Sequence, residues 1–546
     1  MVTMEHTRAL IAAARAVVDQ GILRLANDCR GTDGRVDLAA LDREQAYAYD
    51  LAAAACLVGA AEAMLPWGDS GPLQEMLTAA FTGHVVAEIG AMLQGRERHW
   101  SATGLPWHSG ELAEALARAR SPQLLSAVGE QVATVGLPSV PLPEELDLAR
   151  RVFRDFATTK VAPLAEEVHS RDTDIPEEII REFSRLGLFG MGIPAEYGGS
   201  ASGGPSGYSE DDLLAMLVAT EEITRGSMGL AGPFITRPEI LATAVLTGGV
   251  KEQAARWLPG VAAGDLMVAV AVTEPDYGSD VANLTVRATR DGDYYRISGV
   301  KTWSTFSGRA DLLLLLARTG TREDKHRGLS LFVIEKPPFP GHSWSYEGEH
   351  GGRIEARAIR TIGYRGMHSF EISFEDFVVP AANLIGGEAG LGKGFYLQMK
   401  AFANGRMQTA ARAVGLMRAA FEAAAGYARE RHVFGAALAD YQLTKVKLAR
   451  MAFLLAGCQA YTYACARLIA SGGGQLEASM VKSLSCRAAE WVTREAQQMH
   501  GGYGYAEEYP VSRFFLDARV LSLFEGADET LALRVIARGL VDNAPR

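Results

Sequence analysis

Strand-like patterns in this 546-residue chain are confined to one block, from about residue 265 to residue 385. Apolar residues recur at helical spacing before that block, over residues 4–135 and 143–262, and after it, from residue 390 onward. Helices and strands in separate blocks are typical of an α+β fold, whereas a doubly wound fold alternates them along the chain. No G-x-G-x-x-G follows a strand pattern, which argues against a Rossmann cofactor site. The sequence therefore predicts a mainly helical α+β protein.

Breaks in these patterns predict the domain boundaries. A chain of this length holds roughly three or four units of about 150 residues each. Three prolines within residues 136–143 are typical of a linker. The expected segments are an N-terminal helical extension over residues 1–135, a linker over 136–143, a helical domain over 144–264, a β-domain over 265–385 and a C-terminal helical bundle over 386–546.

The helical patterns also predict where individual helices begin and end. Asp174 is expected to cap a helix that carries Pro176 in its first turn. The longest helices are expected over Thr7–Ala26, Leu41–Met64, Leu73–Leu93, Glu111–Ala133, Phe395–Ala428, Leu443–Ile469 and Leu476–His500, with shorter ones over Asp211–Thr224 and Val250–Leu258.

The β-block begins with the apolar, β-branched run Val268–Val272, which is typical of a buried strand. Asp291 and Gly292 predict a hairpin between two further strands. The Gly/Pro-rich residues 337–357 are expected to loop out, and residues 375–380 to leave the sheet. The remaining strands are expected over Leu284–Thr289, Tyr294–Ser298, Leu312–Ala317, Leu329–Ile334 and Ser369–Phe374.

Composition limits the classes of partner. The net charge of −11 argues against nucleic acid as a partner, because proteins that bind a duplex usually present a basic face. Five cysteines without a C-x-x-C spacing favour reduced, buried thiols in a cytoplasmic protein and predict no metal site. No uninterrupted apolar run reaches about 18 residues, so a membrane partner is not expected. The N-terminus shows no signal-peptide pattern.

Two motifs in the β-block carry the most specific information. Thr273-Glu-Pro precedes Gly278-Ser-Asp, and Lys301-x-Trp303-x-Thr305 follows about twenty residues later. Together they resemble the flavin-binding segments of the acyl-CoA dehydrogenase family. From about residue 145 to 546 the order of elements also resembles that family. The resemblance implies its fold, with a helical domain, a β-barrel-like domain and a C-terminal four-helix bundle, here with an extra N-terminal helical domain.

The resemblance implies FAD as the cofactor. It places Trp303 against the isoalloxazine ring and Thr305 near flavin N5, and it places Ser279 beside the pantetheine arm of the substrate. It implies flavin contacts from Val272, Thr273 and Ser304 as well. A neighbouring subunit's FAD would be contacted by Arg431, Phe434, Gln498, Gly501 and Gly502.

The catalytic base implied by the family motif is Glu525, in Leu523-Phe-Glu-Gly526. Desaturation of an acyl thioester needs a base for the α-proton, and a carboxylate in a dry pocket has a raised pKa that suits this task. Some family members hold the base directly before the arginine that matches Arg406, but that position is Gly405 here. Gly405, Arg406 and Gly526 are expected to border the substrate. Ala527 replaces the usual threonine, which leaves one FAD contact in doubt.

Several features resemble a family member that oxidises a short, branched dicarboxylic acyl-CoA. They are the N-terminal extension, residues 337–357, Gly363–Ser369, Ala403–Arg406 and Phe524–Thr530. A buried substrate carboxylate needs a cation or several donors. The place where glutaryl-CoA dehydrogenases carry an arginine is Met228 here, so Arg237 is the first candidate, and a surface ion pair is its alternative role. Tyr364 and Arg365 are weaker candidates.

The resemblance also implies partners. They are an acyl-CoA substrate and an electron-transfer flavoprotein that accepts the electrons. A homodimer is expected if the N-terminal extension covers the face through which other members form tetramers, and a tetramer remains an alternative. Three other functions stay open: oxidation of another short branched or dicarboxylic acyl-CoA, the DNA-associated branch of the family, and an oxygen-using flavin oxidase. The DNA-associated branch carries a basic C-terminal extra domain, which this acidic chain lacks.

Overall fold

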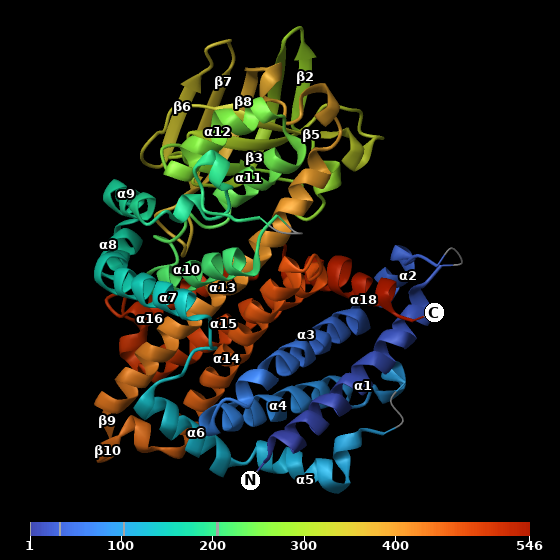
Figure 1. Cartoon of the computed structure of the whole chain (residues 1–546), viewed down its shortest axis with the longest axis vertical. Coiled ribbons are helices and arrows are strands. Elements are labelled where there is room, and N and C mark those ends of the chain that lie inside the picture. The colour runs from blue at the N-terminus through green and yellow to red at the C-terminus, as the bar shows by residue number, and fades with distance from the viewer. Residues whose placement is uncertain (1, 32–33, 102–103, 204–206, 546) are drawn as a thin grey trace. The chain divides into compact units, whose positions relative to one another are not determined.

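The computed structural model describes residues 2–31, 34–101, 104–203 and 207–545, apart from the side chain of Ala403 (Figure 1). The chain forms two compact units. The first unit combines Met1–Asp147 with Thr409–Ile469 and Gly473–Arg546, and the second combines Leu148–Gln408 with Ala470–Gly472. The N-terminal extension therefore shares a unit with most of the C-terminal bundle.

The first unit is helical. The N-terminal helices α1, α3 and α4 pack on one another, and α3 also packs against α15 (Figure 1). Its helices are α1 (Met4–Cys29), α2 (Leu38–Arg43), α3 (Gln45–Gly68), α4 (Pro72–Leu93), α5 (Gly110–Ala119), α6 (Pro122–Val135), α14 (Gln442–Ala470), α15 (Gln475–Met499), α16 (Pro510–Leu521), α17 (Asp528–Thr530) and α18 (Arg538–Asn543), with a π-helical stretch at Leu531–Ala537.

Close helix packing in this unit depends on glycine. A Cβ atom at Gly129 of α6 would lie 1.9 Å from the carbonyl oxygen of Lys445 in α14, so no larger residue fits there. Polar contacts join the two ends of the chain as well: Arg30 donates hydrogen bonds to the carbonyls of Val541 and Ala544. The extension is thus bonded to the C-terminal helices at several points.

Residues 136–143 contain no helix or strand, yet they are firmly held. Arg418 donates a hydrogen bond to the carbonyl of Leu137, and the Val140 amide donates to Gln459 Oε1. Because buried helical side chains bind its backbone, this segment is a packed connection rather than a free tether.

Two N-terminal helices differ from expectation. The helix expected over Leu41–Met64 is two helices, α2 and α3, and α3 continues through Pro66 to Gly68. The helix expected over Glu111–Ala133 is broken at Ser121, whose hydroxyl accepts a hydrogen bond from the Leu124 amide and so caps α6. Apolar periodicity continues across such a break, which is why the pattern concealed it.

In the second unit, helices α7 to α12 precede the sheet. Asp174 does not cap α9, because Pro176 occupies the N-cap position and the Asp174 carboxylate accepts a hydrogen bond from the Gly341 amide. The helices are α7 (Glu144–Phe156), α8 (Ala162–Arg171), α9 (Glu177–Arg185), α10 (Glu210–Gly226), α11 (Arg237–Gly248) and α12 (Lys251–Ala263). The long helix α13 (Gly394–Glu430) begins in this unit and continues into the first.

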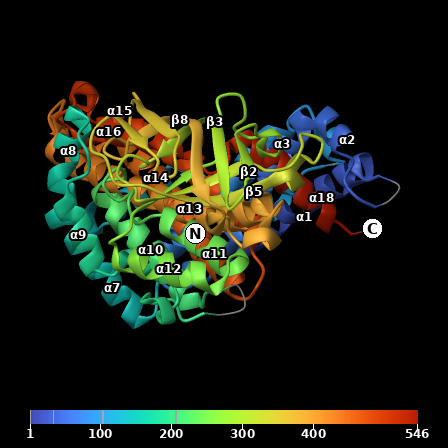
Figure 2. The ribbon, with the colours of Figure 1, turned by 90° about the horizontal axis from the view of Figure 1, so that it is seen from above.

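Within the described residues the sheet of the second unit has eight strands in the order β1-β4-β2-β3-β8-β7-β6, with β5 also paired to β4. β1 and β4 are parallel, β3 and β8 are antiparallel, and the latter two lie side by side in Figure 2. The strands are β1 (Val268–Ala271), β2 (Arg287–Asp291), β3 (Tyr294–Thr305), β4 (Leu312–Arg318), β5 (Leu329–Glu335), β6 (Ser343–Glu347), β7 (Arg353–Ile359) and β8 (Ser369–Pro380).

Three expectations about this sheet were wrong. β3 does not end at Ser298 but continues to Thr305. Residues 337–357 do not simply loop out, because they contain β6 and the first part of β7, which pair with each other. β8 does not end at Phe374 but continues to Pro380 opposite β3. In β7 charged residues alternate with apolar ones. In β8 the adjacent, exposed Glu375 and Asp376 interrupt the apolar pattern before the buried Phe377–Val379.

The sheet carries an apolar cluster on each side. Residues of α11 and α12, among them Leu241 and Trp257, pack with Leu314 and Val333 of β4 and β5. A second cluster, which includes Ile297 and Phe374, joins β3, β7 and β8. Strands covered on both sides form a rigid support for the motifs at their ends.

Two helices of the first unit, α3 and α4, are long and apolar enough to cross a membrane by length and composition. Most of each candidate window is buried inside the structure, 72% in α3 and 61% in α4. Core helices of soluble proteins have the same properties, so these two helices are weak evidence for a membrane span.

Candidate active site

A buried ion pair joins the two motifs of the β-block. Lys301 Nζ lies 2.9 Å from Glu274 Oε1, and both side chains are almost completely buried. Lys301 also donates to the Val272 carbonyl, while Glu274 accepts hydrogen bonds from Thr285 and from the Val286 amide. Burial lowers the pKa of Lys301 to about 8 despite the attraction of Glu274. Burial acts to raise the pKa of Glu274, but the charge and hydrogen bonds of Lys301 outweigh it and lower that pKa.

This pair fixes the end of β3 next to β1. The Thr302 amide donates to the Thr273 carbonyl, and the Ser304 hydroxyl donates to the Val270 carbonyl. The β3–β8 ladder is irregular between Lys301 and Ser304. Of the residues expected at the flavin, Val272, Thr273, Trp303, Ser304 and Thr305 are therefore brought together, and Ser279 lies exposed in the turn that follows Thr273.

Trp303 has an unusual conformation within this group. Its φ is 57°, and 56% of its surface is exposed although its neighbours Thr302 and Ser304 are buried. Thr305 Oγ1 lies 2.8 Å from Ser369 Oγ, so its hydroxyl is oriented by β8. A left-handed tryptophan is costly and persists only where its surroundings impose it. The strand end thus carries a largely exposed indole ring close to a hydroxyl oriented by β8.

The residues considered for the acyl group lie on α11 and α13. Arg237 is buried, and its guanidinium donates hydrogen bonds to the carbonyls of Gly232 and Ile235. Gly405 is buried and Arg406 half-buried on α13. Arg365 is engaged with the carbonyls of Thr361 and His169, which supports a structural role for it. Tyr364 and Met228 are buried.

A buried carboxyl group beside Arg237 was not predicted. Glu239 Oε2 accepts a hydrogen bond from Gln408 Nε2, and Gln408 Oε1 accepts one from the Thr236 amide. Both Glu239 and Gln408 line a cavity together with Phe234 and Pro238. Burial raises the pKa of Glu239 to about 8, although a hydrogen bond with Asn404 acts in the opposite direction. At neutral pH this carboxyl is therefore mostly protonated.

The raised pKa of Glu239 predicts a pH-dependent stability. The folded protein keeps the Glu239 proton up to about pH 8, whereas the unfolded chain releases it near the ordinary pKa of a glutamate. The stabilisation from this proton is therefore complete below the ordinary pKa and is lost as the pH rises through 8. The stability of Glu239→Gln, measured relative to the wild type, should therefore be higher at pH 8 than at pH 5. Urea unfolding at both pH values measures this. A stability difference that is independent of pH would contradict a protonated Glu239.

In the first unit, Glu525 lies in a tightly held turn. Its φ is 53°, that of Gly526 is 100°, and Glu525 Oε2 is buried without a hydrogen-bond partner. The buried Lys482 donates to the Gly526 carbonyl, and Asp528 accepts hydrogen bonds from Ser483 and from Tyr49. α15 and the N-terminal helix α3 thus hold the turn from two sides. An oxygen without a partner in such a turn is available to accept a proton.

The residues expected to reach a neighbouring subunit's FAD are exposed. They lie in two segments, one after α13 and one at the end of α15. Tyr427 and His500, one in each region, stack with ring centroids 4.2 Å apart, which holds these regions together. Phe434 is 99% exposed with φ at 49°. The exposed set is Arg431, Phe434, Gln498, Gly501 and Gly502.

Comparison with known proteins agrees with these features. Residues 143–265 match the N-terminal domain of acyl-CoA dehydrogenases, residues 269–377 the middle domain, and residues 392–541 the C-terminal domain. The chain belongs to the acyl-CoA dehydrogenase family. It is an FAD-dependent oxidoreductase that acts on CH–CH bonds, and its substrate is an acyl-CoA.

One relative matches nearly the whole chain. (2S)-Methylsuccinyl-CoA dehydrogenase of Cereibacter sphaeroides is 36% identical over 99% of this chain and 97% of its own length, so the match includes the N-terminal extension. Several solved structures each cover 74% of this chain. A structure of the electron transferring flavoprotein of Acidaminococcus fermentans matches at 28% identity and a TM-score of 0.66 over 99% of that chain. A glutaryl-CoA dehydrogenase of Mycobacterium smegmatis in complex with FADH2 matches at 25% identity and a TM-score of 0.63 over 96% of that chain.

The geometry of each unit fits FAD. The second unit offers the exposed Trp303 and the oriented Thr305 hydroxyl, which suit a planar, hydrogen-bonding ring. The first unit offers an exposed arginine, Arg431, and an exposed aromatic ring, Phe434. Arginine is well suited to pair with a pyrophosphate.

Proposed function

We propose that the chain oxidises (2S)-methylsuccinyl-CoA to mesaconyl-CoA. The observation that carries this proposal is the match to (2S)-methylsuccinyl-CoA dehydrogenase over 99% of the chain, N-terminal extension included. Within this proposal the enzyme serves the ethylmalonyl-CoA pathway in the cytoplasm. An electron-transfer flavoprotein takes its electrons, and a likeness to a structure of such a flavoprotein supports that choice of partner.

The residues have distinct tasks in this reaction. FAD, when bound, accepts the β-hydride of the substrate. Glu525 accepts the α-proton, because its Oε2 is buried, has no competing hydrogen bond and is held by an anchored turn. Trp303 and Thr305 position the flavin, and the Gly526 side of the turn borders the thioester. Loss of one proton and one hydride leaves the new double bond, so atoms and electrons balance.

Turnover of purified enzyme tests the proposal directly. Methylsuccinyl-CoA, glutaryl-CoA and butyryl-CoA are compared with an artificial electron acceptor, and mesaconyl-CoA is identified by its mass. Methylsuccinyl-CoA should give the highest kcat/KM. Faster oxidation of glutaryl-CoA or butyryl-CoA would favour the second candidate, another short branched or dicarboxylic acyl-CoA. Peroxide formation in air would reveal an oxidase instead.

The partner and the oligomeric state need separate tests. Reduction of purified electron-transfer flavoprotein, followed by its absorbance, tests the proposed acceptor. A homodimer is proposed because the N-terminal helices cover part of the C-terminal bundle in the first unit. A tetramer found by light scattering would refute this covering role and leave the catalytic proposal intact.

Arg237 is proposed to bind the free carboxylate of the substrate. Its buried guanidinium has donors beyond the nitrogen that bonds Gly232 and Ile235. Removal of one partner from a buried, hydrogen-bonded charge pair costs at least about 2 kcal/mol. Arg237→Met should therefore lower kcat/KM for methylsuccinyl-CoA by about 30-fold or more and spare butyryl-CoA.

Arg365→Met is the matched comparison, since Arg365 is the weaker candidate of the same charge. Equal losses for both substrates in Arg237→Met would show that Arg237 is structural. A selective loss in Arg365→Met alone would place the anchor there.

A further inference from the structure

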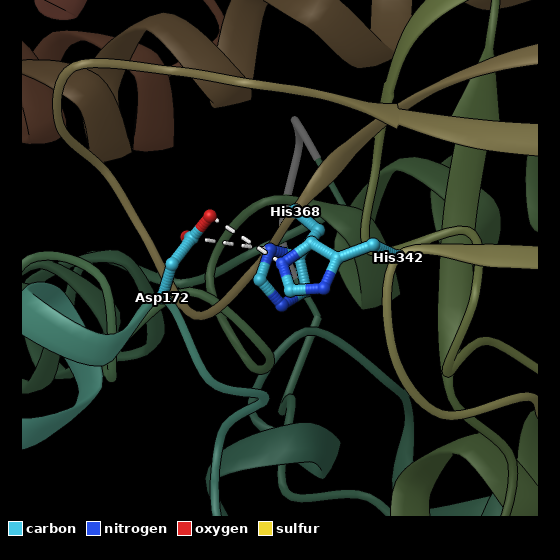
Figure 3. Close-up of side chains that lie close together, drawn as sticks. All are labelled: Asp172, His342 and His368. Carbon is cyan, nitrogen blue, oxygen red and sulfur yellow. Dashed lines mark ion pairs between the residues drawn. The ribbon is translucent and has the colours of Figure 1, made fainter.

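Two histidines and two aspartates meet in the second unit, close to Arg365 and to the end of β3. Asp172 follows α8, His342 precedes β6 within its loop, and His368 precedes β8 (Figure 3). Asp174 lies beside them, between α8 and α9. These residues are too far apart in the sequence to form a recognisable spacing, so no metal site was expected from the sequence.

The distances suit coordination of one cation. His342 Nε2 lies 3.4 Å from Asp172 Oδ2, and His368 Nδ1 lies 3.7 Å from Asp172 Oδ1. One ligand atom from each of the three residues lies within 4.8 Å of the others. Zinc ligands bound at about 2.0–2.2 Å in a tetrahedron are about 3.4 Å apart. The recorded distances are therefore close to the spacing of ligands around one such ion.

The second ring nitrogen of His368 lies at ion-pair distance from a carboxylate, without a hydrogen bond in the observed geometry. Its side chain is only 6% exposed, and its other ring nitrogen, Nε2, lies 3.0 Å from Asp174 Oδ1. Asp174 is in turn fixed by the Gly341 amide, 2.7 Å from its Oδ2. Metal-binding histidines commonly donate their second nitrogen to such a carboxylate, which sets the tautomer and the ring orientation.

We propose that Asp172, His342 and His368 bind a divalent cation of the zinc type, with Asp174 as the positioning residue of His368. Imidazole nitrogens with one carboxylate favour zinc over magnesium, which prefers oxygen ligands. His342 is half-exposed, so water can reach the remaining coordination position. Arg365 Nε lies 3.9 Å from Asp172 and competes with a cation for that carboxylate. Hydrogen bonds from Arg365 to the carbonyls of Thr361 and His169, however, keep its guanidinium in place.

The bound cation would clamp three segments to one another. The carbonyls of Met367 and His368 accept hydrogen bonds from the Phe306 amide. The segment that contains His368 is therefore bonded directly to the end of β3, just beyond Trp303 and Thr305. The site is therefore expected to stabilise the β-domain.

Zinc titration of the flavin-loaded, tag-free enzyme, stripped first with a chelator, tests this proposal. The wild type should bind one Zn²⁺ per chain by calorimetry, and its melting temperature should rise with Zn²⁺ but not with Mg²⁺. His342→Ala should abolish both effects, and Asp174→Asn should weaken zinc affinity by about tenfold. His350→Ala, an exposed histidine in the neighbouring turn, should bind zinc like the wild type.

Other outcomes separate a metal site from a network of ion pairs. If His342→Ala lowers the melting temperature equally with and without zinc, the cluster is only an ion-pair network and the proposal fails. Equal zinc binding by the wild type and His342→Ala would show adventitious binding to surface histidines and would also overturn it. The absorbance of the flavin that stays bound to each variant shows that the protein is folded.

Discussion

Glu525→Gln is expected to lower the rate of desaturation by about 10²- to 10⁴-fold, while FAD stays bound. The amide keeps the shape of the carboxylate but cannot accept the α-proton. Glu525 Oε2 is buried without a hydrogen-bond partner, so the substitution removes no hydrogen bond at that oxygen. Single-turnover reduction of the flavin, followed by absorbance, measures the effect without interference from product release.

The control for this experiment is Glu529→Gln. Glu529 is an exposed carboxylate in the following short helix α17, and its replacement should leave the rate unchanged. Near-normal reduction by Glu525→Gln would refute the assignment of the base. A loss of FAD or of thermal stability in that variant would show instead that Glu525 supports the turn, as Lys482 and Asp528 do.

Lys301→Met is expected to destabilise the protein by about 3 kcal/mol or more, because it leaves the buried charge of Glu274 without its partner. Neither side chain has appreciable contact with water, so solvent cannot replace the lost interaction. Urea unfolding followed by tryptophan fluorescence measures the change. FAD content should fall as well, since the pair fixes the strand end that carries Trp303.

The double variant Lys301→Met/Glu274→Gln separates charge from packing. If the unpaired carboxylate causes the loss, removing its charge should restore part of the stability. A double variant as unstable as the sum of both single variants would show that the pair contributes no coupling. A single variant as stable as the wild type would contradict the role of the ion pair altogether.

The fold class could be predicted because long periodic segments carry a strong signal. The buried strands β4 and β5 were expected within one residue of their observed limits, since both are almost wholly apolar. Strand β8 was cut short because Glu375 and Asp376 end the apolar alternation, although the backbone continues opposite β3. The break between α5 and α6 was missed because one capping serine leaves apolar periodicity unchanged.

The candidate site could be predicted only where a local motif marks it. Trp303 and Glu525 lie in such motifs, and the role of each stays a prediction. The contacts that support them join residues far apart: 169 residues separate Glu239 from Gln408, and 479 separate Tyr49 from Asp528. A single sequence contains no signal for such pairs. The raised pKa of Glu239 likewise results from burial, which arises only after folding.

The first unit combines segments from both ends of the chain, and this affects how the protein folds during synthesis. Residues of the extension pack against helices that follow Thr409, and Arg30 bonds to carbonyls at the very end of the chain. At about 5–20 residues per second, the intervening second unit takes tens of seconds to translate. During that time the apolar faces of α1, α3 and α4 have no C-terminal partner. The extension is therefore the part of the nascent chain that most needs a chaperone, and the second unit can fold before the first is complete.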